Sequence, residues 1–265
     1  AVNVGSDLAP LVRGTVASGT NPTTDVIGSG YQSFKFTKKG GGGTNTFKIS
    51  PYCVTERIGA DAYTDEAPGT GTFIGRYYPN TGGTCSLVNT TDAEVNSIQP
   101  LSNDKVMLKR RIDKLAIAGS TAGHLGTAWA WYLLSPKWNS LFPVASAAAS
   151  YSAEKNRKIA VLMTDGDYNT EYWNGVEAKS SYGADANYLP SNDASELQAP
   201  LLCTEMKKKG IEVYTIGFQV TTAAKNLLIG CATDSKHYYD ATSGEALRQA
   251  FRDIALKISQ LRLSK

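Results

Sequence analysis

The stretch KIAVLMTDGDYNTEY, residues 158–172, decides the fold of this 265-residue chain. Its apolar run from Ile159 to Met163 ends abruptly at a turn that carries Asp165 and Asp167 around a glycine. A short continuous apolar run bounded by turn residues is typical of a strand buried in a parallel sheet. Ligands of such sheets bind beyond the carboxyl ends of the strands. We therefore expect a site at this turn.

The second half of the chain, residues 104–265, alternates between helical and strand patterns. An amphipathic helix is expected first, since apolar residues recur at helical spacing: Val106, Leu108, Ile112, Leu115 and Ala116. Further helices are expected at 122–136, 195–210, 223–232 and 244–263, and strands at 158–164, 211–218 and 237–242. Strands that alternate with helices predict an α/β fold, a doubly wound and mostly parallel sheet covered on both faces.

The first half, residues 1–103, is rich in Gly, Thr, Asn and Pro and has no convincing helix. Residues 33–50 predict a β-hairpin, because two alternating segments flank a loop with four consecutive glycines. Residues 53–99 resemble an irregular insertion. We interpret 1–103 as the amino-terminal part of the same domain, with this hairpin and insertion.

Four cysteines bear on the compartment in which the protein folds. Their order suggests the disulfides Cys53–Cys85, which would tie the insertion, and Cys203–Cys231. No CxxC or Cys/His cluster is present, which argues against a zinc site. The composition resembles that of exported proteins, where disulfides persist. The alternative is that all four cysteines are reduced.

The composition excludes some classes of function. A formal net charge of +3 is too small to indicate nucleic-acid binding, and the basic residues lack interleaved aromatics. No apolar stretch approaches the roughly 18–20 residues that cross a bilayer. We expect no membrane span in this chain, and an anchor upstream of Ala1 is compatible with the sequence.

The aspartate turn suggests a site for a hard cation such as Mg²⁺, which prefers oxygen ligands. Ser120 and Thr121 lie in a glycine-rich loop between two predicted helices, so their hydroxyls are candidate partners of Asp165. Each residue also has a purely structural interpretation. Thr121 would cap the following helix, and Asp165 would stabilise the turn.

Two catalytic alternatives use the same stretch less well. An aspartyl phosphatase would use Asp165 as nucleophile, but Asn169 stands where such enzymes carry Thr or Val. Turnover of an aryl phosphate, lost in Asp165→Asn, would identify one. A Ser/His/Asp hydrolase is less consistent still, because there is no G-x-S-x-G elbow. We interpret the two histidines, His124 and His237, as structural.

Aromatic residues follow the turn directly. Tyr168, Tyr172 and Trp173 are candidates for a rim that recognises a partner. An ordinary exposed loop is the alternative.

Several stretches together resemble the von Willebrand factor A domain, and more closely the carboxyl-terminal part of TadG-like proteins of Tad/Flp pilus assembly. The resemblance covers most of the chain. It rests on VNVG (2–5), CVTERIGADAYTDEAPG (53–69), GSTAGHLGTAWAWYLLSPKW (119–138), KIAVLMTDGDYNT (158–170), LCTEMKKKGIEVYTIGF (202–218) and the segment 231–265.

The resemblance implies a metal-ion-dependent adhesion site with Thr121 and Asp165 as two of its ligands. The family's third element, an Asp-x-Ser-x-Ser motif on its first strand, is missing. We therefore expect the chain to begin after the first strand, the first helix and the second strand of such a domain, which would make the fold incomplete. Mg²⁺, or Ca²⁺ or Mn²⁺, should bind weakly or not at all to the chain as it stands. Asp167 has no counterpart in the resemblance and is interpreted as a loop residue.

These observations predict a non-enzymatic, extracytoplasmic module of the bacterial periplasm or cell surface. The resemblance implies pilus assembly or adhesion, with a protein partner bound through the cation when the missing part is present. A metal-independent structural component of a pilus or envelope is the main alternative. An aspartyl-phosphate phosphatase is the third.

Overall fold

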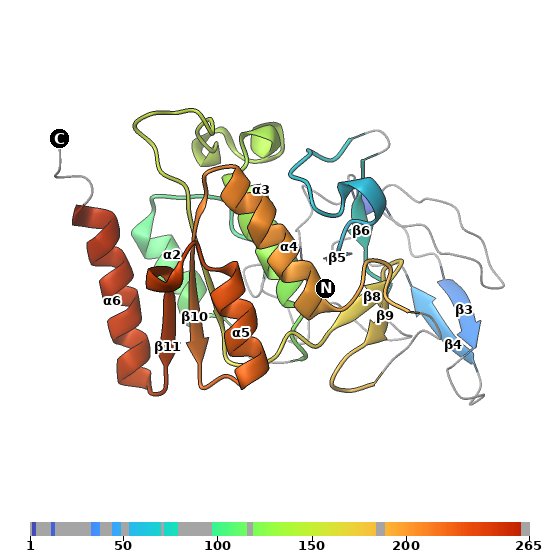
Figure 1. Cartoon of the computed structure of the whole chain (residues 1–265). Helices are drawn as coiled ribbons and strands as arrows, with labels where there is room; N and C mark the ends of the chain where they lie inside the picture. The colour runs from blue at the N-terminus through green and yellow to red at the C-terminus, as the bar shows by residue number, and fades with distance from the viewer. Residues whose placement is uncertain are drawn as a thin grey trace.

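The computed structural model describes residues 53–69, 72–78, 97–115, 119–183 and 189–260 (Figure 1). It also describes the backbone of four short strands: β1 (Val2–Asn3), β2 (Val12–Arg13), β3 (Ser33–Thr37) and β4 (Thr44–Lys48). β3 and β4 pair antiparallel, with Ser33 opposite Lys48, over the two segments expected to form a hairpin.

A parallel sheet of three strands forms the centre of the α/β part, in the order β11-β10-β7. The strands are β7 (Ile159–Thr164), β10 (Glu212–Phe218) and β11 (Tyr238–Ala241). All three coincide with predicted strands. The mixed α/β class with a parallel sheet is confirmed, whereas a complete doubly wound sheet is not seen among the described residues.

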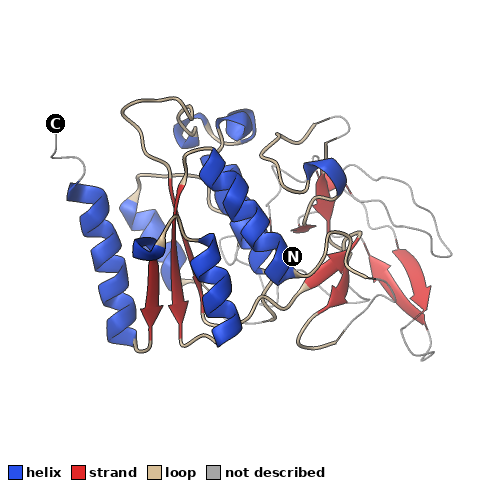
Figure 2. Ribbon diagram, in the orientation of Figure 1, coloured by secondary structure: helices blue, strands red, loops and turns tan. Residues whose placement is uncertain are grey.

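Helices lie on both faces of β10 (Figure 2). On one face Val213 packs in a core with α4 (Ser195–Lys208), and Thr215 Oγ1 donates a hydrogen bond to the carbonyl of Leu228 in α5 (Thr222–Cys231). On the other face Tyr214 and Ile216 pack with α6 (Gly244–Gln260). β10 is therefore the buried strand that its apolar sequence predicts.

β7 is buried on only one face, which corrects the expectation of a fully buried strand. Its Ala160 and Leu162 are buried, but Val161 and Met163 are 39% and 45% exposed. The register sets Val161 beside Tyr214, so the exposed residues lie on the face that α6 covers for β10. Among the described strands β7 pairs with β10 alone.

The predicted amphipathic helix is present as α2 (Lys105–Asp113) and begins at Asp104, whose carboxylate accepts hydrogen bonds from the N–H groups of residues 106 and 107. Its apolar side is not buried as expected. Val106 and Ile112 are 80% and 66% exposed, because α2 does not pack closely on any described element.

Aromatic side chains fill the core between the sheet and the rest of the chain. Helix α3 (Gly123–Leu134) ends before Ser135-Pro136, as predicted, and packs against α4 and β7. Its Tyr132 stacks on Trp138 with ring centroids 4.3 Å apart, and Trp138 lies in the short 3₁₀ segment η3 (Pro136–Leu141). A second 3₁₀ turn, η4 (Val144–Ser146), follows before the chain reaches β7.

Residues 53–78 pack onto this core. β5 (Cys53–Thr55) pairs antiparallel with β6 (Ile74–Arg76), in a sheet with β1 and β2, and the 3₁₀ turn η2 (Gly59–Asp61) lies between them. Val54 and Ile74 belong to the same buried cluster as Trp129 of α3. The first half is thus joined to the α/β part by a shared core.

The disulfide Cys203–Cys231 joins α4 to α5 with a Cα–Cα distance of 5.1 Å, as the order of the cysteines predicts. Cys53 is buried and disulfide-bonded. Its predicted partner, Cys85, lies outside the described residues, as do residues 70–71 and 79–96 of the proposed insertion. No described helix is long and apolar enough to span a membrane.

The remaining elements lie at the two ends of the sheet. β8 (Glu171–Trp173) and β9 (Val176–Lys179) form an antiparallel hairpin after the loop that follows β7. A 3₁₀ turn, η5 (Ser235–His237), leads into β11. The carboxyl ends of the parallel strands, the start of α5 and the β8–β9 hairpin thus border one edge of the molecule.

Candidate functional site at the carboxyl ends of the strands

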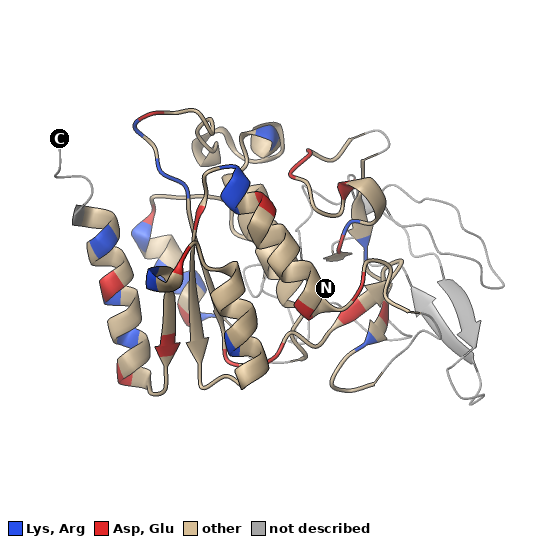
Figure 3. Cartoon of the chain, viewed as in Figure 1, with Lys and Arg blue, Asp and Glu red and all other residues tan. Residues whose placement is uncertain are grey.

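The turn after β7 is closed by its own threonine. Thr164 Oγ1 donates to the Gly166 carbonyl at 2.9 Å and accepts from the Gly166 N–H at 3.2 Å. This arrangement leaves Asp165 and Asp167 exposed at the carboxyl edge of the sheet. Figure 3 shows acidic segments in this loop and at the first turn of α4.

The glycine-rich loop that carries Ser120 and Thr121 lies beside the same edge. The Thr121 N–H donates to Asn169 Oδ1 at 2.9 Å, and the Thr121 carbonyl accepts from the N–H groups of Asn169 and Thr170. Ser120 Oγ lies 2.6 Å from Ser181 Oγ. The structure therefore brings Thr121 to the segment that follows the turn, because its backbone N–H and carbonyl form hydrogen bonds with Asn169 and Thr170.

A tightly held cation needs more oxygen ligands than this edge supplies. Mg²⁺ and Ca²⁺ take six or more oxygens, several of them from the protein in a strong site. The two predicted ligands give one carboxylate, Asp165, and one hydroxyl, Thr121. Within the described part of the chain no three His, Cys, Asp or Glu side chains gather into a metal-binding group. These residues alone do not fit a strong cation site, and the cation stays a prediction.

Tyr168 lies beneath the turn instead of on an exposed rim. Its side chain is only 6% exposed and packs against the start of α3, where a Cβ on Gly123 would lie 2.2 Å from the ring. Glycine is thus required at position 123 for this approach. Burial raises the pKa of Tyr168 to about 12, although its hydrogen bond with Thr127 acts in the opposite direction.

Tyr172 is also buried, which corrects its assignment to an exposed rim. It is 3% exposed, and its ring meets that of Tyr77 edge-on at 5.8 Å. Trp173 is half-buried at the end of β8. Tyr172 therefore anchors the β8–β9 hairpin to residues 53–78, a role that an aromatic side chain in a short strand does not reveal by sequence alone.

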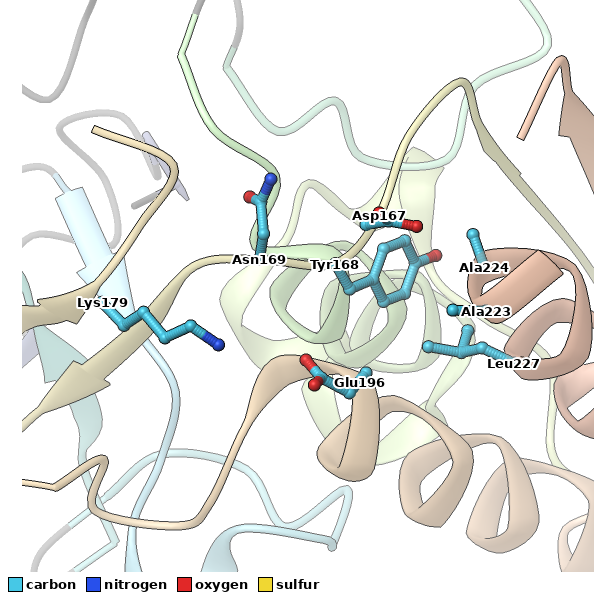
Figure 4. Close-up of a pocket in the computed structure, with 8 residues that line it drawn as sticks. All are labelled: Asp167, Tyr168, Asn169, Lys179, Glu196, Ala223, Ala224 and Leu227. Atoms are coloured by element: carbon cyan, nitrogen blue, oxygen red, sulfur yellow. The ribbon is translucent and has the colours of Figure 1, made fainter. Parts of the chain in front are cut away.

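A pocket of about 450 Å³ opens at this edge, between the turn after β7, the hairpin and the starts of α4 and α5 (Figure 4). Its lining mixes charged, amide and apolar side chains: Asp167, Tyr168, Asn169, Lys179, Glu196, Ala223, Ala224 and Leu227. Figure 4 shows Lys179 on one side of the pocket and Leu227 on the other, with Tyr168 between them. The pocket lies where ligands of parallel sheets bind.

The buried carboxylate of Glu171 lies close to Lys179, a residue of the pocket lining. Its Oε1 accepts the Ser195 N–H at 3.1 Å and lies 4.0 Å from Lys179 Nζ. Burial raises the pKa of Glu171, against the lowering effects of that hydrogen bond and of Lys179. Lys179 is therefore positioned between a buried carboxylate and the pocket.

A serine, a histidine and a carboxylate come together under the same edge. His124 Nδ1 lies 2.7 Å from Ser195 Oγ, and His124 Nε2 lies 3.4 Å from Glu56 Oε2. All three side chains are buried, with exposed fractions of 0% for Ser195, 1% for His124 and 8% for Glu56. A substrate cannot reach the hydroxyl, so this group links residues 53–78 to α3 and α4, in agreement with a structural His124.

Most residues of the pocket were not found from the sequence. Lys179, Glu196 and Leu227 come from β9, α4 and α5, which are separated by long stretches of chain. The sequence does contain one indication, since Glu196 lies in the first turn of a predicted helix. That position is equally explained by interaction with the helix dipole.

No family model and no curated protein matches this chain. Two solved structures of the pilus adhesin SpaC from Lactobacillus rhamnosus GG, the second in an open conformation, are similar to it at 16% identity, with TM-scores of 0.40 and 0.38. The matches cover 58% and 57% of this chain but 21% and 20% of the SpaC chains, about a fifth of their length. TM-scores of this size assign neither fold nor function to this chain.

Proposed function

We propose that this chain is a non-enzymatic module that binds a protein partner at the carboxyl edge of its parallel sheet. The observation that carries the proposal is the mixed pocket between the turn after β7 and the starts of α4 and α5. A small number of precisely placed polar groups beside an apolar surface is typical of binding sites.

Two observations support binding over catalysis. The Ser195–His124–Glu56 group is buried and cannot meet a substrate. The lining of the pocket contains no serine, cysteine or histidine, so it does not provide the nucleophile and base of a Ser–His or Cys–His pair.

An extracytoplasmic location forms part of the proposal. The Cys203–Cys231 disulfide supports it, since structural disulfides persist in oxidising compartments. The resemblance of the sequence to TadG-like proteins supports a role in pilus assembly or surface adhesion. The proposal has two versions. In one, the partner binds through a divalent cation held in part by Asp165, and in the other a structural component binds at the same pocket without metal.

The proposal predicts that a partner touches Ala223, an exposed residue that lines the pocket. A photo-crosslinking amino acid in place of Ala223 should yield one discrete adduct in the envelope of the source bacterium. The same label in place of Leu256, which is 57% exposed on α6, serves as the control and should not yield it. Excess unlabelled chain should compete for the adduct.

Equal adduct patterns from the two positions would contradict binding at this edge. Repeating the experiment with Mg²⁺ and with EDTA separates the two versions of the proposal. Loss of the adduct in EDTA, and in Asp165→Ala, would support a shared cation. An adduct that persists in EDTA would leave the metal-independent version.

A further inference from the structure

We infer that the pocket accepts a basic side chain, arginine or lysine, from the partner protein. This inference rests on the proposed function and adds the chemistry of the group that is bound. It does not involve a cation at Asp165, where a metal would instead capture an acidic group.

The charge of the pocket edge favours a cationic group. Asp167 and Glu196 are exposed carboxylates of the lining, Asp165 is exposed in the same turn as Asp167, and Lys179 is the cation of the lining. The first turns of α4 and α5 contribute about half a positive charge each. The carboxylates of Asp167 and Glu196 in the lining and of Asp165 in the adjoining turn, set against Lys179 and the two helix ends, leave a net charge of about −1, although the chain as a whole carries +3.

The positive end of α5 is already satisfied within the chain. Thr221 Oγ1 accepts a hydrogen bond from the Ala224 N–H at 3.2 Å and donates one to Asp167. An anionic ligand would have to displace Asp167 from this helix end. The start of α5 is therefore a poor site for an added anion.

Glu196 carries the attraction most directly. It lies in the first turn of α4, is exposed, and has no ion pair within the described residues. Lys179, the one cation among the lining residues, lies 4.0 Å from Glu171 instead. A guanidinium or ammonium group entering the pocket would give Glu196 an opposite charge.

The shape of the lining fits the other part of such a side chain. Ala223, Ala224 and Leu227 form an apolar wall on α5, next to the ring of Tyr168 (Figure 4). Arginine and lysine bury an aliphatic stem against apolar surface while the charged head meets polar groups. The wall would hold the stem, and Asp167 and Glu196 would hold the head.

The test is a titration of the folded chain with capped tripeptides, Ac-Gly-X-Gly-NH₂, followed by NMR shifts of the backbone amides of residues 169, 196, 224 and 227. Arginine and lysine at X should bind, whereas citrulline, a neutral analogue of arginine, and glutamate should not. Binding should weaken with added salt, because exposed charges are screened.

Variants of opposite sign sharpen the test. Glu196→Gln should weaken binding of the arginine peptide by about threefold to fivefold, the upper part of the range for an exposed ion pair. Lys179→Met should strengthen it, by about threefold. The matched control is Glu154→Gln, which removes an exposed carboxylate from the loop before β7 and should leave binding unchanged.

Equal binding of citrulline and arginine, preference for glutamate, or no effect of Glu196→Gln in a variant with an unchanged melting temperature would each overturn the inference. Should Glu196→Gln fail to fold, Asp167→Asn provides the same comparison. An adduct at position 223 without any preference for arginine refutes only this inference. A preference for arginine without an adduct refutes the proposed function.

Discussion

The carboxylate of Asp65 is 2% exposed and accepts hydrogen bonds from Ser135 Oγ and Tyr151 Oη, both at 2.6 Å. Its backbone carbonyl accepts the indole N–H of Trp138 at 3.1 Å. Burial alone would raise the pKa of Asp65, but these two hydroxyls and the charge of Lys137 outweigh it, and the pKa is lowered. The ionised form is thus stabilised by the fold.

Replacing Asp65 by Asn should lower the free energy of unfolding by about 2–3 kcal/mol at neutral pH, because a charged acceptor of two hydrogen bonds is lost in a buried site. Urea denaturation followed by tryptophan fluorescence measures this. Asp113→Asn, at an exposed position near the end of α2, is the control and should change stability by less than about 0.5 kcal/mol.

The same variant predicts a dependence on pH. A carboxyl group whose pKa is lowered by folding stabilises the protein at pH values above its pKa in the unfolded chain, about 3.9. This stabilisation is lost as the pH falls through the pKa of the folded state. The difference between the wild type and Asp65→Asn should therefore shrink below about pH 4. A difference that stays constant down to pH 3 would show that Asp65 acts through packing alone.

The sequence predicted the positions of some single residues but not the exposure of others, because burial depends on contacts between distant parts of the chain. Asp165 lies at the end of its strand, as the local pattern indicates, and Thr121 lies beside Asn169 and Thr170 of the following segment, while their role as cation ligands stays a prediction. Tyr172 was misassigned because an aromatic residue after a polar turn looks the same in a rim and in a core. Only its contact with Tyr77, almost a hundred residues earlier, decides between them.

At the scale of elements, the disulfide between α4 and α5 closes a loop of 28 residues. Loop-closure entropy in the unfolded chain predicts a contribution of about 3–4 kcal/mol. The double variant Cys203→Ala/Cys231→Ala should lower the free energy of unfolding by this amount and lower the melting temperature. Dithiothreitol under mildly denaturing conditions should have a similar effect on the wild type but little on the variant, unless Cys53 also contributes.

Helices and strands of the second half follow from the sequence because their periodicity is local. The three parallel strands, α3 with its stop at Ser135, and the closing helix α6 all lie where they were expected. The exposed faces of β7 and α2 could not be predicted. An apolar pattern indicates a surface that requires a partner, but it does not show whether the described chain provides one.

At the scale of the molecule, the location of the pocket could be predicted from the sequence, but most of its lining residues could not. Its edge was predictable, because parallel strands collect ligands at their carboxyl ends. The side chains that give it charge, Lys179 and Glu196, meet only when the β8–β9 hairpin and α4 pack against the sheet. The chemistry of the site therefore depends on tertiary packing more than on any motif.

Residues 53–78 and the α/β part meet closely at Gly175, between β8 and β9. Its carbonyl accepts the Tyr78 N–H at 2.9 Å, and a Cβ added there would lie 1.9 Å from the Arg76 carbonyl oxygen. Its φ of +87° also favours glycine. Both strain and collision thus oppose any side chain at this junction.

Gly175→Ala should destabilise the whole chain by more than 2 kcal/mol, roughly the sum of left-handed strain and the collision. Gly210→Ala is the matched control, since Gly210 has φ +75° but nothing within 4 Å, and should cost only the strain, about 1 kcal/mol. The measurement is the urea midpoint by tryptophan fluorescence. Three of the four tryptophans, Trp129, Trp131 and Trp138, belong to the core of the α/β part. Because residues 53–78 share their core with these tryptophans, we expect a single unfolding transition whose midpoint shifts as a whole. A midpoint equal to that of the wild type would mean that the junction opens without unfolding the core.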